Sequence, residues 1–382
     1  MYTKESLNDL YGKLARSIDI SDDLYEKAVN EYNALGKWID AQTPSYKISI
    51  FPQGSFSLGT VVKPITDSDD YDLDLVCEFD EQYGLSPRQL KVGVVKPLLQ
   101  KYRRISGDIE EKRRCWHVEY EEVPNFHMDI IPAYSLFPHI MITDHDEEND
   151  MYQYIGSNPS GYTDWFLSRS EKQRTALFEQ YKRDNSSIVV AQADVEKIKR
   201  RKIKTPLQRA VQLLKRHRDI MFDGRDPHDK PISVIITTIA GQLYQEEDNV
   251  VDALVRILTG AETYILESKR GDQFYIENPS YAGENFADKW NEHPSRATAF
   301  FEWLNKAKQD LIEKRLLSMS RVEMAAAMNG AIGASTSKRV FSEMAREEES
   351  AIINKQIKVD PKAGTLSTSG TVSVPPNHHY GK

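Results

Sequence analysis

Residues 71–79, Tyr-Asp-Leu-Asp-Leu-Val-Cys-Glu-Phe, constrain the fold more than any other stretch of this 382-residue sequence. Apolar residues and acids alternate at its start, and a period of two is typical of a β-strand with one buried face. Asp72 and Asp74 therefore share a face, roughly 7 Å apart at their Cα atoms. Because two such carboxylates repel each other unless a cation lies between them, the strand predicts a metal site. The alternative is a solvent-facing strand with ordinary surface aspartates.

A third acid lies in another predicted strand. Asp129 is part of residues 126–131, Phe-His-Met-Asp-Ile-Ile, and buried acids are rare unless they are paired or bound to a metal. Residues 115–120 alternate as well, and the Pro-Asn turn between the two segments predicts a hairpin. If the Asp129 strand lies beside residues 71–79, three carboxylates converge at one end of a sheet. Oxygen ligands of this kind suit two Mg²⁺ ions, or Mn²⁺, in phosphoryl transfer.

A Gly-Ser pair follows the strand that we predict for residues 46–51. Gly54 lacks the Cβ atom that would block a ligand, and Ser55 adds a hydroxyl group to the backbone N–H groups of the turn. Such a turn can hold phosphate oxygens. Gln53 lies beside the turn and is a further candidate for nucleotide binding. A Gly-Ser pair is also common in linkers, so the turn gains meaning only from its neighbours.

Charge is distributed unevenly along the chain. The net charge of −8, from 50 basic and 58 acidic residues, argues against a general nucleic-acid coat protein. Residues 67–81 hold eight acids and no base, whereas residues 197–218 hold ten Lys or Arg and no acid. Such blocks are consistent with a metal site facing a polyphosphate site. Two solvated faces of opposite charge are the alternative, and charge alone favours that alternative.

Composition excludes several classes of protein. With 40% hydrophobic and 28% charged residues, the sequence is that of a soluble globular protein. Two cysteines exclude a disulfide framework and leave no Cys-x-x-Cys spacing for zinc. The longest mostly apolar stretch, residues 232–240, is far shorter than the ~20 residues of a membrane span. The N-terminus lacks the features of a signal peptide. We therefore expect a cytoplasmic protein without a membrane partner.

The pattern of helices and strands predicts an α+β fold with a mixed sheet and a mostly helical second half. In the first half a helix is expected over 22–41 and another from Ser86, which Pro97 should kink or end. Thr205 and Pro206 begin a further helix in the same way, with a cap followed by proline. Other helices are expected over residues 231–244, 249–266, 295–318 and 336–353. The predicted domains are a catalytic lobe over 1–160, a helical lobe over 161–355 and a disordered tail over 356–382.

Taken in order, these motifs resemble the polymerase-β type of nucleotidyltransferase. The details are similar to the bacterial CD-NTases, relatives of cyclic GMP-AMP synthase and oligoadenylate synthase that make cyclic oligonucleotide signals against phage. The resemblance covers residues 51–290. It rests on the segments GSFSLGTVVKP, DYDLDLV, FHMDIIPA, SNPSGYTDWF, IKTPLQRAVQLLKRHRD, PISVIITTIAG and IENPSYAGENFADKW.

The resemblance implies a polymerase-β-like core and assigns roles to individual residues. The first two aspartates would bind both Mg²⁺ ions, and Asp129 would help to activate the acceptor hydroxyl. The Gly-Ser turn would hold the β- and γ-phosphates. Lys215 and Ser233 match the Lys and Ser that contact the donor triphosphate in related enzymes. From the sequence alone, Lys215 is one base among ten and is expected to be solvated.

The implied activity joins nucleoside triphosphates, ATP foremost, into a cyclic di- or trinucleotide with release of pyrophosphate. Two alternatives remain: a template-independent RNA 3′-end nucleotidyltransferase, which the acidic net charge disfavours, and an inactive nucleotide-binding protein. No zinc-binding insertion is present, so we expect no stable DNA partner. The resemblance also implies operon-encoded regulatory or conjugating proteins that act on the C-terminal tail.

Overall fold

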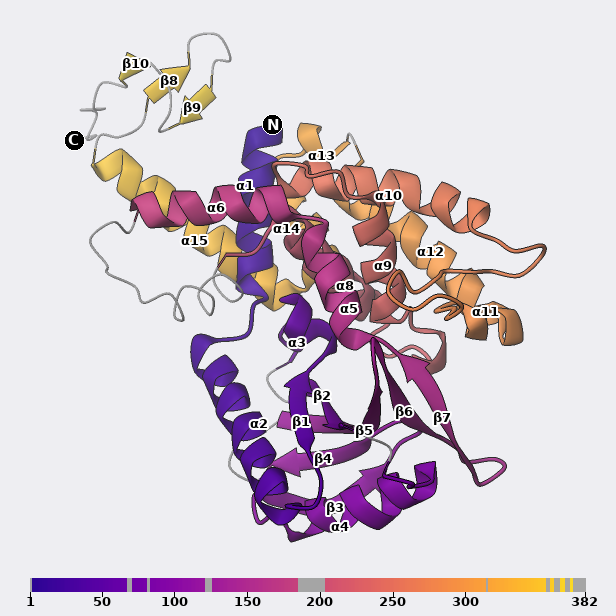
Figure 1. Cartoon of the computed structure of the whole chain (residues 1–382). Coiled ribbons are helices and arrows are strands. Elements are labelled where there is room, and N and C mark those ends of the chain that lie inside the picture. Colours follow the sequence, from indigo (N-terminus) through magenta and orange to yellow (C-terminus); the bar gives the residue numbers. More distant parts are fainter. Residues whose placement is uncertain are drawn as a thin grey trace.

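The computed structural model describes residues 2–66, 71–80, 83–120, 126–184, 203–313, 315–354, 358–360, 365–367 and 372–373. A sheet occupies one end of the molecule, and a group of helices occupies the other (Figure 1). The combination confirms the predicted α+β fold with its mixed sheet and helical second half. In the described ranges, no helix is both long and apolar enough to cross a membrane.

Seven strands form the main sheet, in the order β1-β2-β5-β4-β3, with β6 and β7 continuing from β5. Strands β2 and β5 are parallel, whereas the other neighbours pair antiparallel. The predicted pairing of residues 115–120 with 126–131 is therefore confirmed. The strands are β1 (Ile48–Pro52), β2 (Tyr71–Phe79), β3 (Ile105–Glu111), β4 (Trp116–Tyr120), β5 (Phe126–Leu136), β6 (His139–Asp146) and β7 (Met151–Ser157).

One face of this sheet is covered by helices. The apolar residues that alternate with the acids of β2, including Leu73 and Leu75, are buried there. Helix α2 (Asp22–Gln42), the π-helix η1 (Gln89–Val95) and helix α4 (Lys96–Lys101) enclose this core. We expected Pro97 to kink or end the helix from Ser86; the π-helix η1 ends at Val95, and α4 continues from Lys96. Pro97 lies in the first turn of α4, where its missing N–H group has no helical partner to lose.

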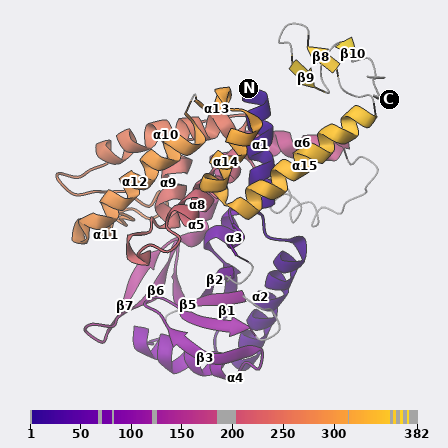
Figure 2. The same ribbon diagram turned by 180° about the vertical axis from the view of Figure 1, so that it is seen from behind.

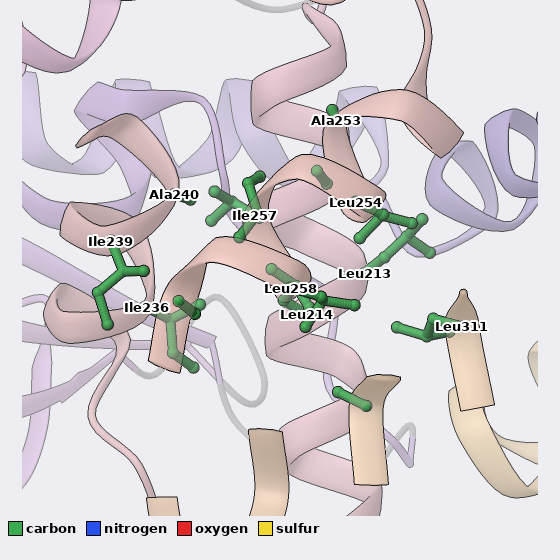
Figure 3. Packing of buried hydrophobic residues seen from close by; sticks show 14 of the residues in the cluster. Leu213, Leu214, Ile236, Ile239, Ala240, Ala253, Leu254, Ile257, Leu258 and Leu311 are labelled. Atoms are coloured by element: carbon green, nitrogen blue, oxygen red, sulfur yellow. The ribbon is translucent and has the colours of Figure 1, made fainter. Parts of the chain in front are cut away.

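The second core joins the helices. Leucine and isoleucine side chains from α8, α9 and α10 meet between the three helices (Figure 3). Thr205 caps α8 as predicted, and the cap is a capping box: its side chain accepts from the N–H of Gln208, whose side chain accepts from the N–H of Thr205. The helices are α1 (Lys4–Ser17), α3 (Gly54–Leu58), α5 (Pro159–Ser168), α6 (Glu171–Asp184), α8 (Pro206–Met221), η2 (Pro227–Asp229, a 3₁₀-helix), α9 (Ser233–Leu243), α10 (Val250–Glu267), α11 (Asp288–Glu292), α12 (Pro294–Leu311), α13 (Arg315–Ser318), α14 (Arg321–Ile332) and α15 (Ala334–Ile353).

The two ends of the chain differ from the predicted domains. We placed residues 1–160 in the catalytic lobe, but α1 packs against α8, α10 and α15. Its buried Leu7, Leu10 and Leu14 lie three or four residues apart and so form one apolar stripe. In the predicted disordered tail, the described residues form three short strands, β8 (Lys358–Asp360), β9 (Thr365–Ser367) and β10 (Val372–Ser373). Figure 2 shows them beyond the end of α15; the rest of the tail lies outside the described residues.

Candidate active site

The parallel pairing of β2 with β5 brings the predicted carboxylates together. Asp74 is the register partner of Asp129, and Asp72 is the partner of His127. Neighbouring strands lie about 4.8 Å apart, so Asp74 and Asp129 start from adjacent points on the same face. The side chain of Asp72 lies outside the described residues. That it shares a face with Asp74 stays a prediction from the period of two along the strand.

The turn after β1 is fitted to Asp74. The backbone N–H of Gln53 donates to the carbonyl of Asp74 at 2.9 Å. Gly54 follows with φ +61°, a conformation that side chains disfavour. A Cβ atom at Gly54 would lie 2.6 Å from Oδ2 of Asp74. We expected this glycine to make room for a ligand; its missing Cβ makes room first for the Asp74 carboxylate.

Two histidines support Asp129, and sequence reasoning did not find this role. Nδ1 of His117 lies 2.7 Å from Oδ1 of Asp129, and Nε2 of His117 lies 2.6 Å from Nδ1 of His127. Strand β4 brings His117 opposite Asp129 in the antiparallel register. The signal was present, because His117 and Asp129 occupy matching positions on the two strands of the predicted hairpin. A carboxylate held in this way has a fixed orientation.

The basic helix α8 is buried, contrary to the expectation of solvated bases. Arg209, Lys215, Arg216 and Arg218 are each less than a tenth exposed, and so is the side chain of Lys204 just before the helix. The structure describes the basic block only from residue 203 onward. Its first five bases, within residues 197–202, therefore lie outside the described residues. Burial, together with a smaller effect of the nearby Arg218, lowers the pKa of Lys215 to about 8.

Helix α8 also holds the segment that follows the Gly-Ser turn. Polar side chains of α8 bond to successive backbone carbonyl groups of this segment, which runs from α3 towards β2. Lys215 Nζ donates to the carbonyl of Thr60 at 3.0 Å. The other contacts are Gln208 to Leu58, Gln212 to Val61, and Arg216 to Lys63 and Pro64. The helix therefore fixes the path of the chain on one side of the phosphate turn.

Arg218 of α8 binds Ser233, and the sequence analysis did not identify this arginine as a site residue. Nη1 of Arg218 donates to Oγ of Ser233 at 2.8 Å and to the carbonyl of Pro231 at 3.0 Å. Asp219 accepts from the same guanidinium, and these contacts hold the arginine in place. Because neighbouring bases on a helix look alike in sequence, only the packing distinguishes Arg218 from the others.

These side chains surround one cleft between the sheet and the helices, with a volume of about 1230 Å³. We call it the central cleft. Every predicted site residue whose side chain the structure describes lines it. Those residues are Gln53, Gly54, Ser55, Asp74, Asp129, Lys215 and Ser233. The cleft also includes residues that the sequence analysis did not assign, namely Arg113, Arg114 and Arg218.

The donor set fits a hard cation. Asp74 and Asp129 offer carboxylate oxygens at one edge of the central cleft, and such ligands suit Mg²⁺ or Mn²⁺. Within the ranges that the structure describes, no three His, Cys, Asp or Glu side chains form a complete metal-binding group. The third predicted ligand, Asp72, lies two residues from Asp74, where its side chain is not described.

Sequence comparison identifies the same part of the chain. Residues 48–134 match the family described as "Cyclic GMP-AMP synthase DncV-like, nucleotidyltransferase domain". A protein of Roseivirga ehrenbergii named c-di-GMP synthase is 29% identical over 310 residues, which are 79% of this chain and 78% of the relative. The matched range contains β1, β2 and most of β5, and so all three aspartates of the predicted metal site.

Solved structures share the fold. The CD-NTase CdnG of Bradyrhizobium diazoefficiens, in complex with GTP, superposes with a TM-score of 0.70 at 24% identity, covering 89% of this chain and 99% of CdnG. CdnC of E. coli MS115-1, solved with ATP, gives a TM-score of 0.61 at 14% identity over 85% of this chain and 98% of CdnC. With the DncV-like domain and the relative from Roseivirga, these similarities make the chain similar to the bacterial CD-NTases over most of its length.

Proposed function

We propose that this protein joins nucleoside triphosphates into a cyclic dinucleotide and releases pyrophosphate, as a signal in bacterial defence against phage. The relative from Roseivirga is named a c-di-GMP synthase, and solved members of the fold hold GTP or ATP. GTP and ATP are therefore the first substrates to test. A cyclic trinucleotide is the nearest alternative product.

One observation carries the proposal. Asp74 and Asp129 occupy the same register on adjacent parallel strands and line the central cleft together with Ser55, Lys215 and Ser233. Acids that bind a cation and groups that bind phosphate thus face a single space. An inactive nucleotide site does not require two such carboxylates beside a phosphate turn. An RNA 3′-end nucleotidyltransferase does require them, and the net charge of −8 is what disfavours that alternative.

The chemistry assigned to the chain is a displacement at phosphorus. The acceptor hydroxyl oxygen bonds to the α-phosphorus of the donor, the bond to the β-phosphate oxygen breaks, and pyrophosphate leaves. Asp129, oriented by His117, would help to activate the hydroxyl. Lys215 and Ser55 would hold the donor phosphates, with Arg218 fixing Ser233 beside them. Mg²⁺ held by Asp72, Asp74 and Asp129 would neutralise the triphosphate and lower the pKa of the attacking hydroxyl.

Incubation with labelled ATP, GTP, CTP and UTP in the presence of Mg²⁺, followed by phosphatase, tests the proposal. A small product that resists phosphatase supports cyclisation, and its mass gives the bases and ring size. A ladder of products would favour the RNA 3′-end polymerase. Nucleotide binding without any product, with or without Mn²⁺, would favour the inactive binding protein.

A further inference from the structure

The turn between β3 and β4 presents two adjacent arginines to the central cleft. Arg113 and Arg114 both line the cleft, and their side chains are about half exposed. Neither has a role among the donor-binding residues. Asp129 lies on β5 at the register of His117, three residues beyond Arg114 along the chain of β4. The arginines therefore lie roughly 10 Å along the sheet from the catalytic carboxylates.

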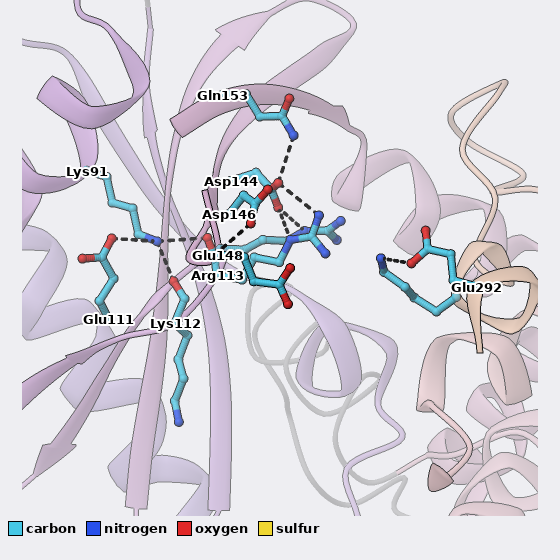
Figure 4. A network of polar contacts seen from close by, with 11 residues as sticks. Lys91, Glu111, Lys112, Arg113, Asp144, Asp146, Glu148, Gln153 and Glu292 are labelled. Carbon is cyan, nitrogen blue, oxygen red and sulfur yellow. Dashed lines mark hydrogen bonds and ion pairs between the residues drawn. The ribbon is translucent and has the colours of Figure 1, made fainter. Parts of the chain in front are cut away.

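Hydrogen bonds to its backbone fix the turn that carries Arg113 and Arg114. Lys91, which is fully buried, donates from Nζ to the carbonyls of Lys112 at 2.5 Å and Arg113 at 3.0 Å (Figure 4). The carbonyl of Arg113 also accepts from the N–H of His145 at 2.8 Å. Backbone held by a buried ammonium group keeps the two side chains at one place on the cleft wall.

The two positive charges of Arg113 and Arg114 exceed the single negative charge of Asp144, the carboxylate that both side chains contact. Asp144 is fully buried, and Arg113 binds it through both Nε, at 2.9 Å, and Nη2, at 3.2 Å. Gln153 adds a hydrogen bond at 3.1 Å. Although burial opposes it, these bonds hold the pKa of Asp144 below its usual range. Arg114 adds a bond of 3.2 Å from Nε to a carboxylate that already has a bidentate partner.

The opposite wall of the central cleft contains charges of both signs. Arg113 is within electrostatic range of Asp288 and Glu292, and Arg114 is within range of Glu284. Lys289 and Arg296 line the same wall beside these acids. This end of the cleft thus has four cationic side chains from two lobes. A ligand with several negative charges can bring them together.

We propose that Arg113 and Arg114 bind the 5′-triphosphate of the acceptor nucleotide. This inference rests on the proposed function. In the first condensation only the donor loses pyrophosphate, and the acceptor keeps its own triphosphate while its hydroxyl attacks. That second triphosphate cannot occupy the Ser55 and Lys215 site, which the donor fills. The arginine pair is a preorganised phosphate-binding group in the same cleft, at a distance that one nucleotide can span.

The variant Arg114→Gln tests the proposal without disturbing the anchor, because Arg113 and Gln153 still satisfy Asp144. The exposed Arg103→Gln, in the sheet lobe and outside the cleft lining, is the matched control. Acceptor use is compared between GTP and guanosine, which has no phosphates, with a fixed donor. We expect Arg114→Gln to lower kcat/KM for GTP about tenfold and to leave guanosine unchanged. Arg114→Lys should recover part of the loss.

Binding stoichiometry separates failure of this inference from failure of the proposed function. With Mg²⁺ and a non-hydrolysable GTP analogue, calorimetry should give two molecules per chain for the wild type and one for Arg113→Gln/Arg114→Gln. Ser55→Ala should weaken the other site. Two sites, one of them lost in the double arginine variant, in a protein that makes no product would refute the function and keep the phosphate site. Equal losses with GTP and guanosine, or two sites retained by the folded double variant, would overturn the inference.

Discussion

The two walls of the central cleft hold their charges in opposite ways. On the sheet wall, Asp74 and Asp129 are like charges at neighbouring register positions. On the α8 wall, buried cations each bond to backbone carbonyls or acids, as Lys215 does with Thr60 and Arg218 does with Asp219. Like charges close together favour the binding of a cation, whereas a cation held by neutral carbonyls keeps its charge for a phosphate. The sheet wall therefore favours a bound cation, whereas the charges of the α8 wall are held in place by the protein itself.

The difference also separates function from stability. Helix α8 is both a core element and a source of site residues, because its polar side chains fix the segment from Leu58 to Pro64. The carboxylates of the sheet wall contribute little to packing, since the apolar residues between them form the core on the other face. We therefore expect substitutions on the sheet wall to change activity alone, and substitutions on α8 to change stability as well.

The largest effect should come from the sheet wall. Asp74→Asn keeps the size of the side chain but removes a charge that would bind Mg²⁺. We expect product formation to fall by about a thousandfold or more, with an unchanged unfolding temperature. Asp80→Asn, at the exposed end of the same strand, is the control. Near-wild-type turnover in Asp72→Asn/Asp74→Asn would show that the metal assignment is wrong.

A methyl group at the phosphate turn should have the next largest effect. The Cβ of Gly54→Ala would displace the Asp74 carboxylate, and a displacement of about 1 Å can cost roughly a hundredfold in rate. Gly84→Ala is a matched control, because Gly84 has φ +68° and nothing lies within 4 Å of its added Cβ. Both variants should lose about 1–2 kcal/mol of stability from the strained φ. Equal activity in the two would mean that the fit to Asp74 is unimportant.

On the α8 wall, Lys215→Met should weaken nucleotide binding while stabilising the empty protein. Losing a charged contact to phosphate costs about 1.5–3 kcal/mol of binding. The lowering of the Lys215 pKa from 10.5 to about 8 by burial corresponds to up to about 3 kcal/mol that the folded protein loses at neutral pH. Calorimetric titration and chemical unfolding at pH 7 measure the two effects. A variant that binds normally would remove Lys215 from the donor site.

The same residue predicts a pH dependence. Because the ammonium form binds phosphate, nucleotide affinity of the wild type should fall as the pH rises through about 8, and affinity of Lys215→Met should stay flat. Stability should move in the other direction. Because the folded state disfavours the proton, the free energy of unfolding of the wild type should rise relative to that of Lys215→Met between pH 8 and 10.5. Parallel pH profiles of affinity for the two proteins would contradict the assignment.

The smallest effect should come from outside both walls. Deleting residues 370–382 should leave synthesis by the purified protein unchanged, because every proposed site residue lies before residue 240. If partner proteins act on the tail, as we propose from the family resemblance, the deletion should reduce signalling only in cells that contain them. Loss of activity in the purified reaction would show that the tail supports the catalytic lobe.

Local pattern was sufficient for the sheet wall. The period of two over residues 71–79 and 126–131 predicted both strands and the shared face of the aspartates, because side chains alternate along a strand whatever its neighbours are. The cap and proline at Thr205 predicted the start of α8, and the Gly-Ser pair predicted a turn. The domain position of α1 was not predicted, because its apolar stripe fits either lobe.

Only the tertiary structure decided which charges matter. Lys215 and Arg218 look like any other bases of a helix. They are distinguished by burial, Lys215 against a carbonyl more than a hundred residues earlier and Arg218 against the hydroxyl of Ser233 on another helix. The contact of His117 with Asp129 and the anchoring of Arg113 by Asp144 depend on strand register and on a buried carboxylate. The sequence by itself determined the elements and the acids, since these follow from local periodicity. The partners of each charge required the fold, because long-range pairing carries no local signal.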